Sequence, residues 1–502
     1  MYYFLNDNMQ FSKSGIEHAE INRLNLFKAH HVPARIVTRM FAMNLHEVLD
    51  QAQIDDHDFI NLFDFFCGSQ HVARQKVRLA DFEIPADAIK TRKDQHVQVM
   101  HHGKLLMIIY LRRDQDEVSN VQYFDVNGKT IKMVWWDTRG FKCLEQLFDW
   151  EGKITQEAYF GPDGHAHIEK EHYLNHAGQE RLTWRVLDYR GTAWTFSGMH
   201  QLTRFFYDEL NRNGEANVYI CDRTVECAWG LFNMTTPAKK VLHLHNNHVG
   251  DASDSLHATL NNNYANALNN WRLWDGVISA TPEQTQDVQA RFGTDIPAFT
   301  IPVGYVDQAT LTADPVDFAT RQKHLVVQVA RLAPEKQPDQ TIAAFQQVHH
   351  DFPDAQLEFW GYANGDIQKQ LTSQVKQLHL EAAVHFKGYT TDVAAVYNRA
   401  QVGILPSRAE GFSLMLLEAQ AHGLAMVAND VKYGPSDIIR DGVSGILTTD
   451  GQVEQLTAAM RKLFKDQALL ASYSANAYQN AQRYSAETVY QQWQAFMQTM
   501  QA

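Results

Sequence analysis

Residues 410–423 read EGFSLMLLEAQAHG, and this stretch decides how the C-terminal half of the chain folds. Glu410 precedes a short polar turn, and Glu418 follows eight positions later inside an apolar run. The sequence VGILPS at 402–407, just before it, is typical of a short buried strand. A strand, a turn and an apolar helix in this order predict one unit of a parallel α/β sheet.

The segment after this strand predicts a helix whose first turn faces a ligand. We expect the helix over 414–422, with Ser413 as its N-cap and Gly423 at its end. Ligands in open α/β sheets bind outside the carboxyl ends of the strands. The free backbone N–H groups of Phe412, Ser413 and Leu414 would therefore point into a cleft and suit a phosphate.

The two glutamates can serve one ligand from different places. Glu410, followed by Gly411, lies in the loop beside the reacting group, whereas Glu418 lies one turn into the helix, where it can reach a ribose. They could thus hold opposite ends of a nucleotide sugar and need not form a hydrolytic acid/base pair. Taken alone, Glu418 is better explained as an ordinary solvent-facing residue of a helix.

A second polar feature follows the expected strand at 325–330, in the sequence VARLAPEK. It places Arg331 and Lys336 at the carboxyl end of that strand. Arginine can hold a diphosphate through two parallel hydrogen bonds, and lysine acts as a point charge. Without other evidence, such a pair is more often part of a solvated loop.

Strands alternate with helices in most of the remaining sequence. MYYFLN at the N-terminus predicts a strand, residues 14–30 a helix, and the run DFINLFDFF at 58–66 a further strand. The same alternation returns after residue 205, where Thr281 and Pro282 mark a helix start. The pattern predicts two Rossmann-like halves.

Between about 70 and 200 the pattern changes to strand-type residues separated by turns. Glycines recur every 12 to 14 residues, where tight turns require a positive φ, at Gly128, Gly140, Gly152, Gly164, Gly178 and Gly191. This regularity predicts a meander of antiparallel hairpins inserted into the first half, rather than a set of loose surface loops.

Composition excludes several classes of protein. The chain has 502 residues, of which 45% are hydrophobic, and a net charge of −13, which disfavours general nucleic-acid binding. Four scattered cysteines form no CxxC pair and suit a reducing cytoplasm. The N-terminus lacks the pattern of a secretory signal, and the longest aliphatic run, at 105–111, is too short to span a bilayer. We therefore expect a cytoplasmic enzyme.

Together these features resemble the family 4 retaining glycosyltransferases of the GT-B fold, in which two Rossmann-like domains face a cleft. The resemblance rests on the E-x7-E motif of Glu410 and Glu418, the pair Arg331 and Lys336, and YGPSDII at 433–439. The inserted meander is similar to that of the bacterial subgroup containing teichoic acid α-glycosyltransferases and the transferases that glycosylate serine-rich adhesins.

The resemblance implies the limits of the domains. We expect an N-terminal Rossmann-like domain over 1–70 and 205–305, an inserted β-rich domain over 71–204, and a C-terminal nucleotide-sugar-binding domain over 306–485. The terminal helix at 486–502 would return to the N-terminal domain.

The resemblance also implies roles for individual residues. Arg331 and Lys336 would bind the donor diphosphate, and Glu418 the ribose. Glu410, together with the backbone of Gly411, Phe412 and Ser413, would orient the donor sugar, and Leu414 would be a further donor-binding residue. Tyr389 falls where the family contacts uracil.

In the N-terminal half, Gly15 falls where the family's backbone approaches the phosphates, although Ser14 replaces the first glycine of the usual pair. The family also places an active-site histidine after the strand that ends in HLHNNH. Both His245 and His248 qualify; we favour His248 and leave His245 open. No D-x-D metal motif faces the expected cleft, so we expect no metal or other cofactor, with the two cations neutralising the leaving group.

The predicted function is retaining transfer of glucose or N-acetylglucosamine from a UDP-sugar to a cell-envelope acceptor. We favour poly(glycerol or ribitol phosphate) teichoic acid and keep a Ser/Thr-rich surface protein as the alternative. Basic residues of the insertion could contact a polyol phosphate, although an ordinary solvated face explains them equally well: Lys90, Arg92, Lys93, Lys104, Arg112 and Arg113.

A non-catalytic, acceptor-binding partner subunit is a third hypothesis, which the full set of donor residues disfavours. We further expect homo-oligomers or heteromers formed through the meander, no nucleic-acid partner, and at most peripheral association with the inner face of the membrane.

Overall fold

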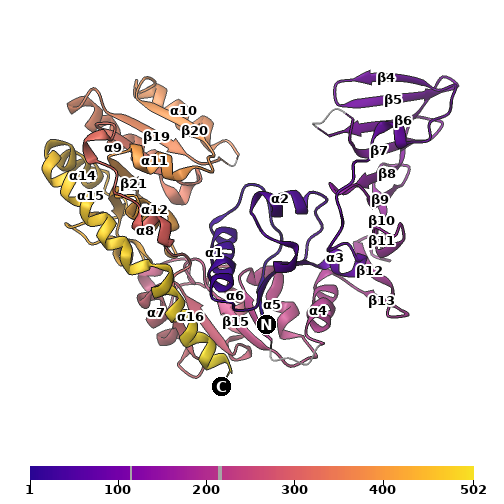
Figure 1. Ribbon diagram of the computed structural model, residues 1–502, viewed down its shortest axis with the longest axis horizontal. Coiled ribbons are helices and arrows are strands. Elements are labelled where there is room, and N and C mark those ends of the chain that lie inside the picture. The colour runs from indigo at the N-terminus through magenta and orange to yellow at the C-terminus, as the bar shows by residue number, and fades with distance from the viewer. Residues whose placement is uncertain (113–115, 213–216, 364, 502) are drawn as a thin grey trace. The chain divides into compact units, whose positions relative to one another are not determined.

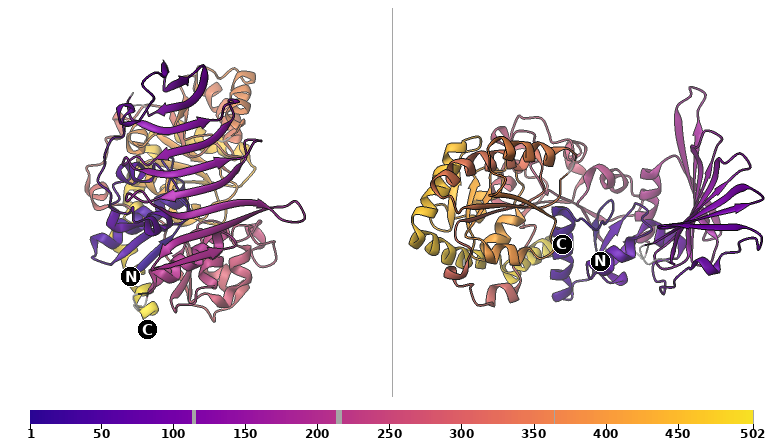
Figure 2. Two further views of the ribbon diagram at one scale, coloured as in Figure 1. Left: turned by 90° about the vertical axis from the view of Figure 1, so that its right-hand side faces the viewer. Right: turned by 90° about the horizontal axis from the view of Figure 1, so that it is seen from above.

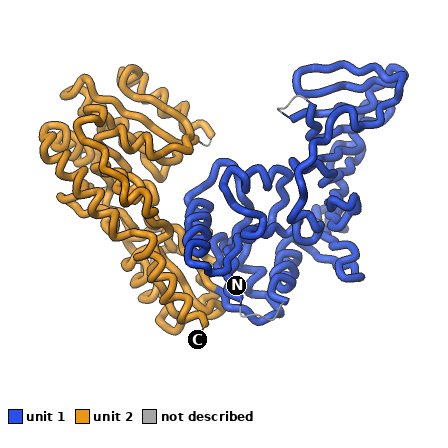
Figure 3. The backbone as a smooth tube through the Cα atoms, viewed as in Figure 1, with its two compact units in different colours: residues 1–240 blue, residues 241–502 orange. Residues whose placement is uncertain are grey.

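The computed structural model describes residues 1–112, 116–212, 217–363 and 365–501. The chain divides into two compact units, residues 1–240 and 241–502 (Figure 3). None of the helices within the described ranges has both the length and the apolar character needed to cross a membrane.

The first unit contains parallel strands in the order β14-β1-β2-β3. The strands are β1 (Tyr2–Leu5), β2 (Ala34–Thr38), β3 (Phe59–Asn61) and β14 (Val218–Cys221). The helices between and beside them are α1 (Gly15–Ala29), α2 (Leu45–Gln51), α3 (Leu62–Cys67), α4 (Met199–Leu210) and α5 (Thr224–Phe232) (Figure 1). The predicted first strand and the helix after it are confirmed.

The strand predicted over 58–66 is wrong in its second half. Only Phe59–Asn61 is a strand, and Leu62–Cys67 forms α3. The Asn61 side chain accepts a hydrogen bond of 2.9 Å from the Phe63 N–H, which caps a helix start, and Gly68 ends the helix at φ 65°. An apolar run buried on all sides has no periodicity that separates a strand from a helix.

The insertion is a single antiparallel sheet in which each strand pairs with the next one along the chain, so the predicted meander is confirmed. Its strands fan out with a continuous twist (Figure 2). They are β4 (Ile89–Lys93), β5 (His96–His101), β6 (Lys104–Leu111), β7 (Val118–Phe124), β8 (Thr130–Trp136), β9 (Lys142–Phe148), β10 (Ile154–Phe160), β11 (Ala166–Leu174), β12 (Glu180–Tyr189) and β13 (Thr192–Phe196).

A repeated turn explains the glycine period. Asp125 Oδ1 accepts backbone N–H groups from Asn127 and Lys129, and Gly128 between them has φ 79°. Asp149 makes the equivalent bonds around Gly152, and Asn175 around Gly178. An acidic or amide side chain three residues before a glycine therefore closes each of these hairpins. All six glycines of the predicted series have a positive φ.

Aromatic rings join the meander to α3. Phe63 lies 4.6 Å from Tyr159 of β10 and 6.0 Å from Trp184 of β12, measured between ring centroids. The other end of the sheet has its own apolar core, in which Val99, Ile109 and Val121 are fully buried. The meander is thus built around separate apolar clusters and is attached through α3.

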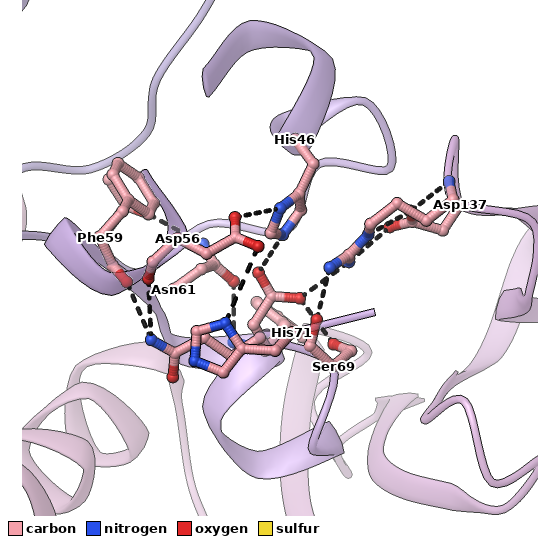
Figure 4. Close-up of polar contacts among 12 residues, drawn as sticks. His46, Asp56, Phe59, Asn61, Ser69, His71 and Asp137 are labelled. Carbon is pink, nitrogen blue, oxygen red and sulfur yellow. Dashed lines mark hydrogen bonds and ion pairs between the residues drawn. The ribbon is translucent and has the colours of Figure 1, made fainter. Parts of the chain in front are cut away.

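A buried polar network lies beside this joint (Figure 4). His46 contacts Asp56 Oδ1 at 2.9 Å through Nδ1 and Asp64 Oδ2 at 3.0 Å through Nε2. Arg139, in the turn between β8 and β9, donates to Asp64 Oδ1 at 3.2 Å and to Asp137 Oδ1 at 2.8 Å. Asp64 contacts His46 of α2 through one carboxylate oxygen and Arg139 of the meander through the other. It therefore links the meander to the α/β portion of this unit.

The second unit contains two sets of parallel strands. The first set, in the order β15-β16-β17, comprises β15 (Lys239–His243), β16 (Gly276–Ser279) and β17 (Ala298–Thr300). The second is a six-stranded sheet in the order β20-β19-β18-β21-β22-β23. Its strands are β18 (Leu325–Val329), β19 (Gln356–Trp360), β20 (Val384–Gly388), β21 (Val402–Leu405), β22 (Ala425–Asn429) and β23 (Gly445–Thr448).

Helices cover both faces of the six-stranded sheet, so its strands are apolar throughout. Val326 of β18 belongs to one buried cluster, whereas Leu325 and Val327 belong to another. The helices of the unit are α6 (Ala265–Asn269), α7 (Pro282–Phe292), α8 (Gln308–Thr312), α9 (Pro338–Asp351), α10 (Ile367–Gln377), α11 (Val393–Arg399), α12 (Leu414–Ala421), α13 (Pro435–Ile438), α14 (Val453–Lys465), α15 (Gln467–Ala481) and α16 (Ala486–Gln501).

The terminal helix α16 packs on the three-stranded set. Phe496 lies 5.1 Å from Phe299 of β17, and Met500 lies against Gly276 of β16. The predicted cap of α7 is confirmed, since Thr281 accepts from the Gln284 N–H and Pro282 is the first helical residue. The domain limits stated above stay predictions.

The His46 network makes stability depend on pH. Burial disfavours the charged imidazole, but the hydrogen bonds and charges of Asp64 and Asp56 outweigh burial and the repulsion of Arg139, so the pKa of His46 is raised. This stabilisation is complete below the unfolded-state pKa of about 6.5 and is lost as pH rises through the folded-state pKa. We expect the free energy of unfolding of His46→Gln to fall less steeply between about pH 6 and pH 8 than that of the native chain.

Urea denaturation at several pH values measures both slopes. His176→Gln, at an exposed histidine of the meander, is the matched control and should keep the native slope. Identical slopes for the native chain and His46→Gln would contradict the assigned role.

Candidate active site

The carboxyl ends of three strands bring the predicted donor residues to one edge of the six-stranded sheet. Arg331 and Lys336 follow β18, Tyr389 follows β20, and residues 410–414 follow β21. Residues that are up to 83 positions apart in the chain are thereby grouped where α/β sheets bind ligands.

Lys336 and Glu410 are in direct contact at this edge. The Lys336 ammonium lies 2.5 Å from Glu410 Oε1, and both side chains are largely buried. The Gln328 side chain holds the Lys336 carbonyl through a hydrogen bond of 3.0 Å, and Thr341 in turn donates to Gln328. The loops after β18 and β21 also share a backbone bond from Arg408 N–H to the Glu335 carbonyl at 2.9 Å.

Arg331 belongs to the same loop but lies farther out. Its guanidinium contacts Glu335 at 3.0 Å, and both side chains are about two-fifths exposed, at 41% and 43%. Such an exposed pair contributes little to stability, so an anionic ligand can compete for the arginine at small cost.

The predicted helix after Glu410 is α12, Leu414–Ala421, one residue shorter than expected at its end. Its N-cap Ser413 has a left-handed backbone with φ 82°, which is uncommon for a residue other than glycine. Within the described part of the chain, the N–H groups of Ser413 and Leu414 make no hydrogen bond. The start of α12 therefore presents unpaired donors.

Glu418 is on α12 beside a buried tyrosine. Tyr397 donates to Glu418 Oε2 at 3.3 Å. The carboxylate reaches solvent, yet protein atoms surround it closely, and this desolvation raises its pKa to about 7 although the Tyr397 bond acts in the opposite direction. A carboxyl group poised near neutrality is common at ligand sites.

Tyr389 is an exposed ring after Gly388, and it has an aromatic neighbour that the sequence did not single out. The rings of Tyr389 and Tyr362 lie 6.4 Å apart at 53°. A planar base could contact both rings. The FKGY sequence indicated Tyr389, but nothing in the sequence around Tyr362 distinguishes it from a loop residue.

Gly15 lies in the first unit and begins α1. A Cβ atom at this position would meet no atom within 4 Å, so the surface beside it is open. Ser14 caps the helix, and the Ser14 N–H donates to Glu17 at 2.6 Å. Arg223 holds Glu17 at 2.7 Å. The start of α1 thus already carries a carboxylate and a guanidinium.

The two candidate histidines differ in surroundings. His248 is fully buried and stacks on Tyr433, with ring centroids 6.1 Å apart. Burial lowers its pKa to about 4, although Asp287 and the Ser255 backbone favour the charged form. His245 is partly exposed, and a Cβ atom on Gly411 would lie 2.3 Å from its carbonyl oxygen. The structure thus places His245 beside the Glu410 loop.

A loop after β22 supports the site, although its sequence indicated no role beyond family likeness. Tyr433 N–H donates to the Glu410 carbonyl at 3.0 Å. Gly434, at φ 107°, packs so closely that a Cβ atom would lie 2.1 Å from the Phe412 carbonyl oxygen. The signal that could have revealed this is the glycine in YGPSDII, which close backbone approach requires.

Gly434→Ala should destabilise the chain more than its backbone conformation alone explains. Gly442 also has a positive φ, of 69°, but a Cβ atom there meets nothing within 4 Å. Gly442→Ala should cost about 1 kcal/mol for the left-handed conformation. Gly434→Ala should lose roughly 2 kcal/mol more, because the 410–412 backbone must move. Chemical denaturation of both variants provides the comparison, and equal losses would show that the close packing is unimportant.

Comparisons with known proteins identify similar chains. Residues 314–480 match the family described as glycosyl transferases group 1. The GtfA subunit of the UDP-N-acetylglucosamine–peptide N-acetylglucosaminyltransferase of Streptococcus gordonii is 25% identical, over 98% of this chain and 97% of its own length. Poly(ribitol-phosphate) alpha-N-acetylglucosaminyltransferase of Staphylococcus aureus is 22% identical over 97% of both chains. Poly(glycerol-phosphate) alpha-glucosyltransferase of Bacillus subtilis is 23% identical over 98% of this chain and 74% of its own.

Solved structures share the fold over nearly the full length. Pneumococcal O-GlcNAc transferase GtfA, in complex with UDP and GlcNAc, has a TM-score of 0.85 at 21% identity and covers 99% of this chain and 98% of its own. A GtfA/B complex gives a TM-score of 0.81 at 23% identity, covering 100% of both chains. The expected GT-B architecture with its inserted antiparallel sheet is therefore confirmed. Residues 314–480 match the glycosyl transferases group 1 family, and the chain is a glycosyltransferase.

Proposed function

We propose that this chain transfers N-acetylglucosamine or glucose from a UDP-sugar to a cell-envelope acceptor, on the cytoplasmic side of the membrane and with retention of the anomeric configuration. The observation that carries the proposal is the contact between Lys336 and Glu410 beside the unpaired N–H groups of α12. The names of the relatives, two N-acetylglucosaminyltransferases and one glucosyltransferase, support the choice of sugars.

The donor groups match the chemistry of the site. The diphosphate suits Lys336, Arg331 and the N–H groups of Ser413 and Leu414, which together offer charge and directed donors. The ribose hydroxyls suit Glu418, which lies about one turn into the helix that begins at those N–H groups. The uracil base suits the rings of Tyr389 and Tyr362.

Glu410 would orient the transferred sugar while Lys336 neutralises the leaving diphosphate. In same-face attack, the bond from the anomeric carbon to the phosphate oxygen breaks, and the acceptor oxygen bonds to that carbon on the same face. The acceptor proton passes to the departing phosphate oxygen. The reaction in this form uses no metal ion, because Lys336 and Arg331 carry the required positive charge, and catalysis comes from position and electrostatics.

We assign the cleft histidine to His245 rather than to His248. Two observations support this choice: the contact of the His245 backbone with Gly411, and the complete burial of His248 behind Tyr433. Gly15, which faces open space at the start of α1, would let the N-terminal half approach the donor without a side chain in the way.

The six basic residues of the insertion differ in their surroundings, and Lys104 is exposed at the start of β6. Lys90, Arg92 and Lys93 are all exposed on β4, the end strand of the sheet, and suit a polyol-phosphate acceptor. Arg112 instead donates to the Trp136 carbonyl at 2.6 Å and pairs with Glu117 at 3.5 Å, so it serves the fold. Arg113 lies outside the described residues.

Teichoic acid is therefore the proposed acceptor. A Ser/Thr-rich protein is the second candidate, because the Streptococcus gordonii relative is named as a peptide N-acetylglucosaminyltransferase. The solved GtfA/B complex supports a heteromer as the assembly state, and the inserted sheet is the proposed contact surface.

A screen of donors against acceptors tests the function. UDP-glucose and UDP-N-acetylglucosamine are each offered with poly(glycerol phosphate), poly(ribitol phosphate) and a serine-rich peptide, and product is followed by mass spectrometry and by NMR of the anomeric proton. We expect an α-linked product with one donor on a polyol phosphate. A β-linked product, or no turnover of any UDP-sugar, would overturn the proposal.

Lys336→Ala and Glu410→Gln should fail in different ways. Loss of the lysine removes a charge-assisted bond to the diphosphate and should weaken UDP binding by roughly tenfold to 100-fold. Glu410→Gln keeps the shape of the side chain and should leave UDP affinity within about threefold, while transfer falls on the order of 100-fold or more. Calorimetry gives the affinity and a transfer assay the rate. Unchanged UDP affinity in Lys336→Ala would remove the lysine from the donor site.

UDP affinity should rise with pH through the titration of Glu418. Desolvation by the surrounding protein atoms raises its pKa to about 7, and the ionised carboxylate accepts ribose hydroxyls better than the neutral acid. UDP should bind the native chain roughly fivefold more tightly at about pH 8 than at pH 6, after division by the change that Glu418→Gln shows over the same pH range. That variant corrects for the titration of UDP itself. Parallel pH profiles of the two proteins would mean that Glu418 does not touch the ribose.

A further inference from the structure

Helix α7 contacts both backbone segments that border the proposed cleft. Its residues Gln284 and Asp287 point to different partners. The Gln284 amide donates to the Asn246 carbonyl at 2.8 Å, next to His245, whereas Asp287 Oδ2 accepts from the Tyr433 hydroxyl at 2.7 Å and from the Lys432 ammonium at 2.9 Å. One helix thus holds the loop after β15 and the loop after β22.

The bond between Asp287 and Tyr433 involves a fully buried tyrosine. Tyr433 is fully buried and has His248 stacked against its ring. Burial disfavours the charged Asp287, but the hydrogen bonds of Lys432, Tyr433 and Ser255 outweigh it, so the pKa of Asp287 is lowered. Glu283, one turn earlier on α7, pairs with Lys432 at 3.0 Å and is 44% exposed.

Tyr433 transmits this contact to the proposed catalytic loop. Its backbone N–H donates to the Glu410 carbonyl, and the following Gly434 lies against the Phe412 carbonyl. Gly411, in the same segment, lies against the His245 carbonyl. The Glu410 loop therefore contacts two segments, and α7 is hydrogen-bonded to both.

We propose that Asp287 is a positioning residue for Glu410, acting through the Tyr433 hydroxyl. This inference rests on the proposed function, since it assigns Glu410 to orientation of the transferred sugar. Of the proposed diphosphate contacts, the two cations Lys336 and Arg331 come from the β18 loop and do not pass through Tyr433, whereas the N–H groups of Ser413 and Leu414 follow the Glu410 loop. Loss of the Asp287–Tyr433 bond should therefore impair sugar transfer more than nucleotide binding.

The test uses Asp287→Asn, Tyr433→Phe, the double variant and Glu283→Gln in the full-length chain. Misplacement of a reacting group by a fraction of an ångström can cost up to about 100-fold in rate. We expect each of the first two variants to lower kcat about tenfold or more, with UDP affinity within about threefold of native. The double variant should be no worse than the poorer single variant, because both changes break one bond.

Glu283→Gln is the matched control, because it alters a carboxylate on the same helix that binds Lys432 but not Tyr433. It should keep kcat within about twofold of native. Tyr433→Phe removes the hydroxyl but keeps the ring that packs on His248. If Asp287→Asn does not fold, the kcat of Tyr433→Phe alone tests the role of the Asp287–Tyr433 bond. A thermal melt of each variant identifies that case.

The native chain separates this inference from the proposed function. Native protein that turns over no UDP-sugar removes the function. Native turnover with unchanged kcat in Tyr433→Phe, multiplying losses in the double variant, or an equal loss in Glu283→Gln overturns the role of Asp287 alone. A kcat loss accompanied by an equal loss of UDP affinity also overturns it, because a general structural defect produces that result.

Discussion

The pairing of Lys336 with Glu410 fixes the arrangement on which the rest of the candidate site depends. It joins the loop after β18 to the loop after β21, and the Arg408–Glu335 backbone bond joins the same two loops a second time. Both charged groups are largely buried, and removing one partner of such a pair leaves an uncompensated charge, at a cost of about 3–5 kcal/mol. The contact between these two residues therefore contributes both to fold stability and to the proposed donor site.

Backbone packing adds a second constraint around this pair. Gly411 and Gly434 lie where any side chain would overlap a neighbouring carbonyl, so three loops can stack without intervening atoms. Ser413 adopts a left-handed conformation to start α12 directly after this stack. Strained or glycine-dependent backbone of this kind is characteristic of sites in which donors must point at a ligand.

The inserted sheet obeys simpler rules, and its amino-acid sequence shows them directly. Each of the hairpins at Asp125, Asp149 and Asn175 closes on an acidic or amide side chain followed three residues later by glycine, so local turn chemistry sets the period. The attachment of the sheet follows no such local rule. The network of His46, Asp64 and Arg139 joins residues that are up to 93 positions apart, and no local pattern identifies such partners.

The sequence by itself determined the α/β alternation, the antiparallel meander and the N-cap at Thr281, because these depend on periodicity, turn chemistry and local capping, and it gave the order of the proposed donor residues along the chain. The prediction for 58–66 was wrong, because a run buried on all sides lacks periodicity and a single cap at Asn61 decides for a helix. Only the tertiary structure decided that Lys336 contacts Glu410 and that Tyr362 lies beside Tyr389. It also decided that His248 is buried while the His245 backbone contacts Gly411. The contact of α7 with the segments around the Glu410 loop is likewise visible only in the structure. Those facts depend on which strand ends become neighbours in the sheet, and that order is set by packing across the whole unit rather than by any segment of the chain.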